Sequence, residues 1–271
     1  MIAADLIVKD RNMEDIAGNL WDKIREEAWA SSTNEPILAS FFHSTILNHK
    51  NLSSALSYQL ANRLDCSTMP AILVREVIDE AFLNDTDIIA CAMADIIAVQ
   101  NRDPAVEEYP RPLLYLKGFH ALQIHRVAHW FWKQDRVALA LYLQNRSSVI
   151  FGVDIHPAAI IGKGIMLDHA TGIVVGETAI IENNVSLLQG VTLGGTGKEG
   201  GDRHPKIRQG VMIGAGAKVL GNIEIGIGAK VGAGSVVLDA VPEHTTVAGV
   251  PAKVVGRPSC EMPSLSMEQS L

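Results

Sequence analysis

The sequence feature that most constrains the fold is a six-residue repeat that runs from Val153 to Val255. One aliphatic residue occupies the same position in each repeat, with a two-residue slip after Leu167 and a longer break after Leu193. The aliphatic positions are Ile155, Ile161, Leu167, Val175, Ile181, Leu187, Leu193, Ile207, Ile213, Val219, Ile225, Val231 and Val237. A six-residue period fits neither the turn of an α-helix nor the two-residue alternation of a simple strand, and it is typical of a parallel β-helix.

A second periodic position supports the same interpretation. Four residues after many of the aliphatic positions stands a small or aliphatic residue, such as Ala159 or Ala217, and Gly often follows the aliphatic residue directly. We expect each repeat to form one short strand and one corner, with the aliphatic side chain inside and Gly where a corner needs a positive φ angle. Three repeats then make one triangular coil, which buries its apolar interior against the coils above and below it.

The first half of the chain has a helical pattern instead. An apolar stripe with a four-residue spacing over residues 16–28 predicts an amphipathic helix. Pro36 and Pro70 stand where further helices would begin, and a long helix is expected over about Leu113–Gln134. Gly is rare before residue 118 and dense after residue 152, so the composition changes near Phe151.

We therefore expect an α+β chain in two parts. An all-α helical domain over residues 1–150 is followed over residues 151–257 by a left-handed parallel β-helix of hexapeptide repeats. The segment Gly194–Pro205 is too rich in Gly and polar residues to fill a coil interior, so it predicts a loop extruded from one corner. The tail over residues 258–271 is rich in Ser, Pro, Met and Glu, and we expect it to be mobile.

Composition and charge argue against several classes of protein. A content of 48% hydrophobic and 20% charged residues is typical of a globular protein, and a net charge of -7 argues against non-specific binding to nucleic acid or to anionic membranes. No apolar stretch approaches the ~18 residues of a transmembrane helix. The acid-containing segment Met1–Glu27 does not have the pattern of a secretory signal. Cys66, Cys91 and Cys260 are widely spaced, which indicates reduced thiols in a cytoplasmic protein.

The strongest catalytic candidates are Asp154, the pair Asp168-His169 and the pair Arg203-His204. Asp168 and His169 stand at or near a predicted corner, and Asp154 precedes His169 by about one coil. We expect Asp154 and His169 to meet across adjacent coils, because a carboxylate that holds an imidazole makes a general base. The alternative is that Asp168 and His169 are solvated corner residues. The Arg-His pair in a Gly-rich loop favours a functional site, because loops on rigid scaffolds often carry function.

Two histidine patterns offer metal-binding alternatives. His125 and His129 have the spacing of metal ligands on a helix, but the Glu of a metalloprotease motif is missing and aromatic residues surround them. We therefore expect these two side chains to serve packing. His156, His169 and His204 form a minor alternative, a three-histidine zinc site.

From about Asp15 to Pro258 the sequence resembles bacterial serine O-acetyltransferase. The repeats alone are similar to a broad acyltransferase superfamily, whereas the helical half and five longer strings are specific to the serine enzyme. The strings are Arg102-Asp103-Pro104-Ala105, Tyr115-Leu116-Lys117-Gly118-Phe119-His120, Val153-Asp154-Ile155-His156-Pro157, Leu167-Asp168-His169-Ala170-Thr171-Gly172 and Gly201-Asp202-Arg203-His204-Pro205. The resemblance implies acetyl transfer from acetyl-CoA to the hydroxyl of L-serine, which gives O-acetyl-L-serine for cysteine biosynthesis. It also implies that His169 is the general base and that Asp154 orients it.

The resemblance assigns the substrate-binding residues as well. Asp103 and Asp168 match the carboxylates that hold the ammonium group of serine. Arg203 matches the residue that binds its carboxylate, and His204 lies beside Arg203. The chemistry agrees, because a guanidinium group matches a carboxylate with two parallel hydrogen bonds and the neutral serine hydroxyl needs a base before it can attack a thioester.

The co-substrate site is implied by analogy with the superfamily, in which acetyl-CoA lies between the β-helices of neighbouring subunits. Its candidate residues here are Gly195, Ala215, Lys230 and Ala233. The resemblance implies no metal.

The resemblance further implies partners and control. We expect a homo-oligomer, a trimer whose helical domains join it to a second trimer in a hexamer, and feedback inhibition by L-cysteine. In this family the C-terminal peptide also binds O-acetylserine sulfhydrylase. The chain ends in Leu271, where the family usually has Ile, and the first dozen residues match nothing in the family.

Two other functions stay open at the level of sequence. A hexapeptide acetyltransferase for a sugar or an antibiotic rarely carries a helical domain of this size and needs no paired acids for an ammonium group. A non-catalytic scaffold would leave Asp154, His169 and Arg203 without a role.

Overall fold

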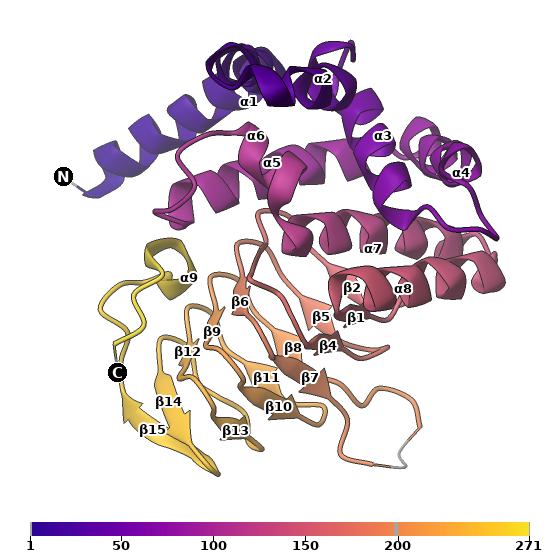
Figure 1. Cartoon of the computed structure of the whole chain (residues 1–271). Helices are drawn as coiled ribbons and strands as arrows, with labels where there is room; N and C mark the ends of the chain where they lie inside the picture. Colours follow the sequence, from indigo (N-terminus) through magenta and orange to yellow (C-terminus); the bar gives the residue numbers. More distant parts are fainter. Residues whose placement is uncertain (1, 198–199, 271) are drawn as a thin grey trace.

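The computed structural model describes residues 2–197 and 200–270 as a layer of helices packed on a β-prism (Figure 1). The helical elements are α1 (Ile2–Asn34), the 3-10 turn η1 (Pro36–Leu38), α2 (Ala39–Phe42), the π-helical turn η2 (His43–Leu47), α3 (Leu52–Leu64), α4 (Ala71–Asn84), α5 (Asp87–Arg102), α6 (Pro110–Tyr115), α7 (Lys117–Lys133) and α8 (Val137–Phe151). Leu20, Ile24 and Ala28 of the predicted stripe are fully buried. None of the described helices has the length and apolar character needed to cross a membrane.

The single helix expected over Leu113–Gln134 is wrong, because the structure divides it into α6 and α7. Leu116, between the two helices, has an extended backbone with φ -90 and ψ 107. The break brings Gly118 so close to the prism that a Cβ atom would lie 2.1 Å from the carbonyl oxygen of Leu167. Only glycine permits such a close approach of the two backbones. The break at Leu116 therefore allows the start of α7 to pack directly on the first coil.

Short strands form the prism, and over the described residues they assemble into three sheets. The β1 sheet contains β1 (Val153–Ile155), β4 (Ile173–Val175), β7 (Thr192–Gly194), β10 (Lys218–Leu220) and β13 (Val236–Val237). The β2 sheet contains β2 (Ile160–Ile161), β5 (Ile180–Ile181), β8 (Lys206–Ile207) and β11 (Glu224–Ile225). The β3 sheet contains β3 (Met166–Asp168), β6 (Ser186–Leu188), β9 (Met212–Ile213), β12 (Lys230–Val231), β14 (Thr246–Gly249) and β15 (Ala252–Gly256). Each coil passes through the sheets in this order, and we name its corners β1–β2, β2–β3 and β3–β1.

The strand register explains the period of the sequence. The repeated aliphatic side chains point into the prism and are buried, apart from the half-buried Ile161. Val174 pairs with Thr192, eighteen residues later, whereas Val153 pairs with Ile173, twenty residues later. The first coil therefore contains two additional residues, which is the origin of the slip. The predicted helical part followed by a parallel β-helix is confirmed.

The far end of the prism differs from the expected repeat. The pattern was expected to continue to Val255, but β15 runs antiparallel to β14 as a hairpin. An antiparallel partner pairs the backbone groups that would otherwise leave the last strand of this sheet as an open edge.

A buried ion pair joins the helical layer to the prism. Asp95 of α5 is 0% exposed and accepts hydrogen bonds from Arg126 Nη2 at 2.7 Å and from Gln123 Nε2 at 3.0 Å. The second carboxylate oxygen of Asp95 accepts the backbone N–H of Ile165 in the first coil at 2.9 Å. Arg126 of α7 also donates to the carbonyl oxygen of Gly162 at 2.8 Å. One carboxylate therefore connects two helices and a turn of the prism.

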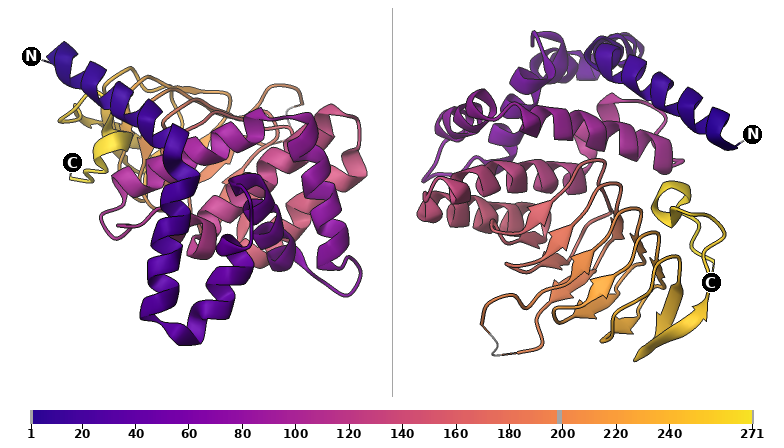
Figure 2. Two further views of the ribbon diagram at one scale, coloured as in Figure 1. Left: turned by 90° about the horizontal axis from the view of Figure 1, so that it is seen from above. Right: turned by 180° about the vertical axis from the view of Figure 1, so that it is seen from behind.

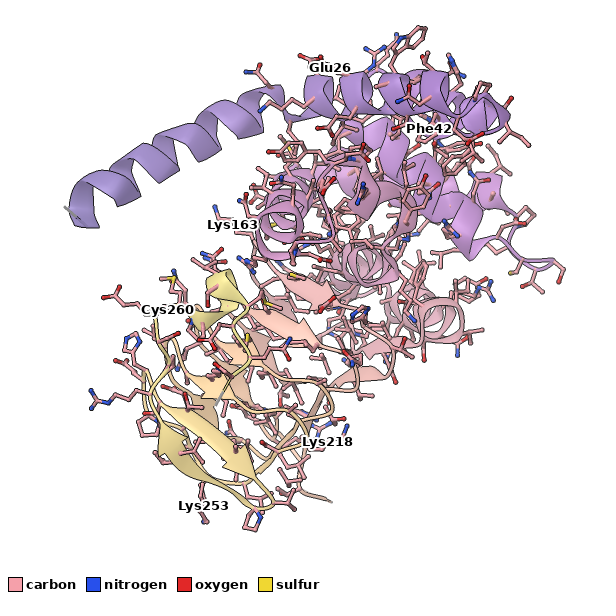
Figure 3. The ribbon with its side chains drawn as sticks, turned by 60° about the vertical axis from the view of Figure 1, so that its left-hand side comes forward. Glu26, Phe42, Lys163, Lys218, Lys253 and Cys260 are labelled. Carbon is pink, nitrogen blue, oxygen red and sulfur yellow. The ribbon has the colours of Figure 1, made fainter. Side chains whose placement is uncertain are left out.

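The C-terminal tail packs between the β3 sheet and α5 and contains helix α9 (Pro263–Ser266) (Figures 2 and 3). Ser264 is 0% exposed, and its hydroxyl donates to the carbonyl oxygen of Asn184 at 2.5 Å. The Ser186 hydroxyl donates to the carbonyl oxygen of Ser264 at 3.0 Å. The sequence pattern did not predict this packing, because the contacts exist only once the prism is formed. The mobility of the tail stays a prediction.

Replacing Asp95 by Asn should destabilise the protein by roughly 3–5 kcal/mol, because the buried guanidinium of Arg126 would lose the carboxylate charge with which it is paired. The comparison is Glu80→Gln, which alters the ion pair with Arg136, whose side chains are 42% and 44% exposed. That variant should lose less than about 1 kcal/mol. Urea unfolding of both variants measures the difference, and equal losses would contradict the proposed role of Asp95.

Candidate active site

The two additional residues of the first coil are His169 and Ala170, which follow β3 at a β3–β1 corner. Both have left-handed backbones, with φ 53 and φ 58. Such conformations cost non-glycine residues about 1–3 kcal/mol each and are concentrated at functional sites. The bulge leaves the His169 side chain 76% exposed, with Nε2 3.8 Å from the Asp168 carboxylate. The fold therefore presents this imidazole to solvent on a strained segment.

Two carboxylates accompany His169. Asp168 ends β3, and Asp103 lies directly after α5, where its carboxylate accepts the backbone N–H of Ala105 at 2.9 Å. Burial raises the pKa of the Asp168 carboxyl; the neighbouring His169 opposes this shift, and the charge of Asp103 adds to it. We call Asp103, Asp168 and His169 the bulge half-site. It can attract a cation and accept a proton.

Arg102 holds the end of α5 that carries Asp103, and sequence reasoning missed this role. Its side chain is buried and donates to the Ser186 hydroxyl at 3.2 Å and to Asn184 Oδ1 at 3.3 Å. Burial lowers the pKa of this guanidinium to about 10. The only signal in the sequence was that Arg102 precedes Asp103 in one of the strings that carry the resemblance.

A second polar cluster lies at the β1–β2 corners, where the extruded loop returns to the prism (Figure 1). The Thr178 hydroxyl accepts the backbone N–H groups of Arg203 at 3.0 Å and His204 at 3.1 Å. Arg203 Nη2 donates to Glu177 Oε2 at 2.6 Å, and this hydrogen bond lowers the pKa of the Glu177 carboxyl. We call Glu177, Thr178, Arg203 and His204 the loop half-site.

The hydrogen bonds of His204 specify its protonation. The backbone N–H of Thr178 donates to His204 Nδ1 at 3.2 Å, so the pattern assigns the ring proton to Nε2. The ring lies over Gly176, where a Cβ atom would approach Nε2 to 2.1 Å. Burial and the charge of Arg203 lower the pKa of His204, which keeps the ring neutral near pH 7. His204 is therefore a hydrogen-bond donor rather than a cation.

Sequence reasoning selected Arg203 and His204 but missed Glu177 and Thr178. An alignment of successive coils could have identified them, because residues 177 and 178 occupy the same corner as the loop, one coil earlier. The long insertion concealed this alignment, since it removes the fixed spacing from which a register is read.

Asp154 lies on the outer face of β1, where Gln144 Nε2 of α8 donates to its Oδ1 at 2.7 Å. In the described part of the chain its hydrogen bond is to Gln144 and not to His169. The two residues belong to the same coil rather than to adjacent coils. Their pairing in catalysis stays a prediction.

The four candidate co-substrate residues do not form one cluster in a single chain. Ala215 and Ala233 lie on successive β3–β1 corners, where the N–H of Gly234 donates to the carbonyl oxygen of Ala215 at 2.8 Å. Gly195 lies instead at a β1–β2 corner, at the start of the loop. Lys230 of β12 is 3% exposed, and its ammonium group donates to the carbonyl oxygen of Ser270 in the tail.

The histidines do not assemble a metal site within the described residues. No group of three or more His, Cys, Asp or Glu side chains there is arranged to hold a metal ion. His125 is buried in α7, and His129 Nδ1 lies 2.7 Å from the carbonyl oxygen of Pro157. His156 packs edge-on against Trp132 with ring centroids 5.0 Å apart.

Comparison with known proteins gives consistent results for both halves of the chain. Residues 20–124 match the family model "Serine acetyltransferase, N-terminal", and residues 204–239 match "Bacterial transferase hexapeptide (six repeats)". The serine acetyltransferase of Escherichia coli (strain K12) is 66% identical over 250 residues, which cover 92% of each chain.

Two solved structures of serine acetyltransferases are also similar. A complex with cysteine has a TM-score of 0.92 and 63% identity, with coverage of 94% of this chain and 99% of that one. A complex with CoA has a TM-score of 0.85 and 65% identity, with coverage of 88% and 99%.

Replacing Thr178 by Val should loosen the loop half-site, because two backbone N–H groups lose their acceptor. An unsatisfied buried donor costs about 1–3 kcal/mol, so the rate of trypsin cleavage after Arg203 should rise roughly tenfold. Thr192→Val, on the outer face of β7, is the matched control. An unchanged cleavage rate in Thr178→Val would contradict the role of this hydroxyl.

Proposed function

Because the chain belongs to the serine acetyltransferase family, we propose that it transfers an acetyl group from acetyl-CoA to the hydroxyl of L-serine. The products are O-acetyl-L-serine and CoA, and the reaction belongs to cysteine biosynthesis. The observation that carries this proposal is the 66% identity over 92% of the chain, which spans both the helical half and the repeats. The bulge half-site and the loop half-site supply groups that suit a serine zwitterion.

The bulge half-site suits the nucleophilic end of serine. Asp103 and Asp168 attract the ammonium group, and the exposed imidazole of His169 takes the hydroxyl proton as the oxygen attacks the thioester carbonyl. When the tetrahedral intermediate collapses, the C–S bond breaks and the imidazolium returns its proton to the CoA thiolate. Asp154 would stabilise that imidazolium, as an acid beside a catalytic histidine does.

The loop half-site suits the other end of the substrate. Arg203 is paired with Glu177 and has the geometry to bind a carboxylate with two hydrogen bonds. The neutral His204 has an Nε2–H that can donate to the substrate. Within one chain these groups occupy β1–β2 corners, whereas His169 occupies a β3–β1 corner. The site would be complete where the loop half-site of one copy meets the bulge half-site of the next.

This arrangement supports a homo-oligomer as the active form. Three copies with parallel prisms would form three equivalent sites, and the helical layers would join two trimers in a hexamer. A solved relative was determined in complex with CoA. Here Gly195, Ala215 and Ala233 are the proposed contacts of acetyl-CoA. Lys230 would join them after the tail releases its ammonium group.

L-Cysteine is the proposed feedback inhibitor, because it differs from L-serine only in having sulfur in place of oxygen. A similar structure was determined in complex with cysteine.

The tail is the proposed contact with O-acetylserine sulfhydrylase, and its last residue, Leu271, lies outside the described residues. Such a contact would require the tail to detach from the part of the prism on which Ser264 packs. The cytoplasm is the proposed location.

The direct test is serine-dependent release of thiol from acetyl-CoA by the purified protein. In the same assay His169→Asn should lower kcat by about 10²–10⁴, the contribution of a positioned base. Asn tolerates the left-handed backbone of residue 169, so the bulge should survive. His244→Asn is the matched control, because His244 is also exposed at a corner with φ 49. A folded His169→Asn variant that keeps more than about a tenth of the activity would refute the base assignment.

Replacing Arg203 by Ala should weaken L-serine and L-cysteine together, because both zwitterions present the same carboxylate. Loss of a charged hydrogen bond predicts an increase of about tenfold or more in KM for serine and in the inhibition constant for cysteine. Arg208→Ala is the control, since Arg208 forms ion pairs with Glu182 and Glu224 elsewhere on the prism. A variant that loses serine affinity but retains full cysteine inhibition would show two separate sites.

A further inference from the structure

Lys206 closes the base of the extruded loop. It is the first residue of β8, where the loop has returned to the prism, and its side chain is only 15% exposed. Its ammonium group donates to the carbonyl oxygens of Thr178 at 2.9 Å and His204 at 2.7 Å. It also donates to Asp202 Oδ1 at 2.6 Å. An ammonium group has three N–H donors, so these contacts use all of them and hold three groups of the chain in place.

These contacts fix the backbone from which the Arg203 side chain projects. The Thr178 hydroxyl accepts the backbone N–H groups of Arg203 and His204. Lys206 binds the carbonyl oxygens of Thr178 and His204, and it binds the side chain of Asp202. The residues directly before and after Arg203 are therefore both held by one ammonium group.

The charges around Arg203 give the ammonium group a second effect. The Arg203 guanidinium donates to Glu177 at 2.6 Å and to the carbonyl oxygen of Gly201 at 3.0 Å. The two acids of this region, Glu177 and Asp202, would repel a substrate carboxylate that approaches the guanidinium. Lys206 forms an ion pair with Asp202, and this hydrogen bond lowers the pKa of the Asp202 carboxyl. The second cation thus balances the second acid.

We propose that Lys206 is a positioning residue for the substrate carboxylate: it orients Arg203 and neutralises Asp202. This inference rests on the proposed function. Lys206 does not touch the substrate in this assignment, because its donors are already used, and it acts through Arg203. A group that only tied the loop together would act regardless of the charge on Asp202. A group that also balances charge makes substrate affinity depend on that acid.

Arg208 provides an internal comparison. It follows β8 at the end further from the loop, and its guanidinium donates to Glu182 at 2.7 Å and pairs with Glu224. These acids belong to the coils before and after its own. Arg208 therefore also bridges neighbouring coils through a cation, but at a β2–β3 corner instead of at the loop half-site.

Replacing Lys206 by Met keeps the apolar stem and removes the charge. We expect KM for L-serine and the inhibition constant for L-cysteine to rise about tenfold, which corresponds to ~1.4 kcal/mol. The value of kcat and KM for acetyl-CoA should change less than about threefold, because the bulge half-site is unaltered. Lys206→Arg keeps the charge and should retain most of the affinity for serine. Arg208→Met is the matched control and should leave all of these constants unchanged.

A double variant separates charge from structure. Lys206→Met combined with Asp202→Asn removes the unbalanced acid but does not restore the hydrogen bonds to the two carbonyl oxygens. We expect its KM for L-serine to return to within about threefold of the wild-type value. A purely structural tie would give no such recovery, because the double variant has lost both partners of the ion pair.

The outcomes separate this inference from the proposed function. If the wild-type protein releases no thiol with serine, the proposed function fails and the role of Lys206 falls with it. If the wild type is active and Lys206→Met keeps its KM for serine, only the role of Lys206 is overturned. A defect that persists undiminished in the double variant would also overturn it. Lys206→Gln, which can still donate to a carbonyl oxygen, replaces Lys206→Met in both comparisons if the Met variant does not fold.

Discussion

Each coil of the prism buries its aliphatic interior only against its neighbours, so the first coil needs a cover from another part of the chain. Helices α7 and α8 provide that cover, and the buried Asp95–Arg126 pair attaches α5 and α7 to the first coil. The same docking positions the catalytic candidates. Gly118 contacts the carbonyl oxygen of Leu167, and the ammonium group of Lys117 donates to the Thr171 hydroxyl. The bulge that carries His169 lies between these two contacts.

The strain of that bulge and its exposure have a common cause. The first coil has two residues more than a regular coil. These two residues bulge out of the β3–β1 corner, and both have left-handed backbones. The cost of about 1–3 kcal/mol per residue is offset by the rigid coils and helix on either side. A side chain displaced in this way is oriented by the backbone and remains accessible, which is what a general base requires.

The charged groups of the site are divided between different corners of the prism. The acids and His169 lie at the bulge, whereas Arg203 and the neutral His204 lie beside the extruded loop. Separation within the chain leaves Arg203 paired with Glu177 instead of with Asp103 or Asp168. Complementary half-sites on one rigid body would link activity to assembly, because neither half holds both ends of a zwitterion alone.

The sequence by itself determined the prism and the loop, and it selected most of the polar residues of the candidate site. Six-residue spacing needs no distant partner to be recognised, and Asp168, His169 and Arg203 interrupt it with groups that cannot fill an apolar coil. Only the tertiary structure decided the break at Leu116, the roles of Arg102 and Thr178, and the docking of Ser264. Each of these depends on contacts between segments far apart in the chain, and local periodicity carries no information about such distances. The two-residue slip was visible in the sequence, but only the strand register showed that it lifts His169 out of the corner.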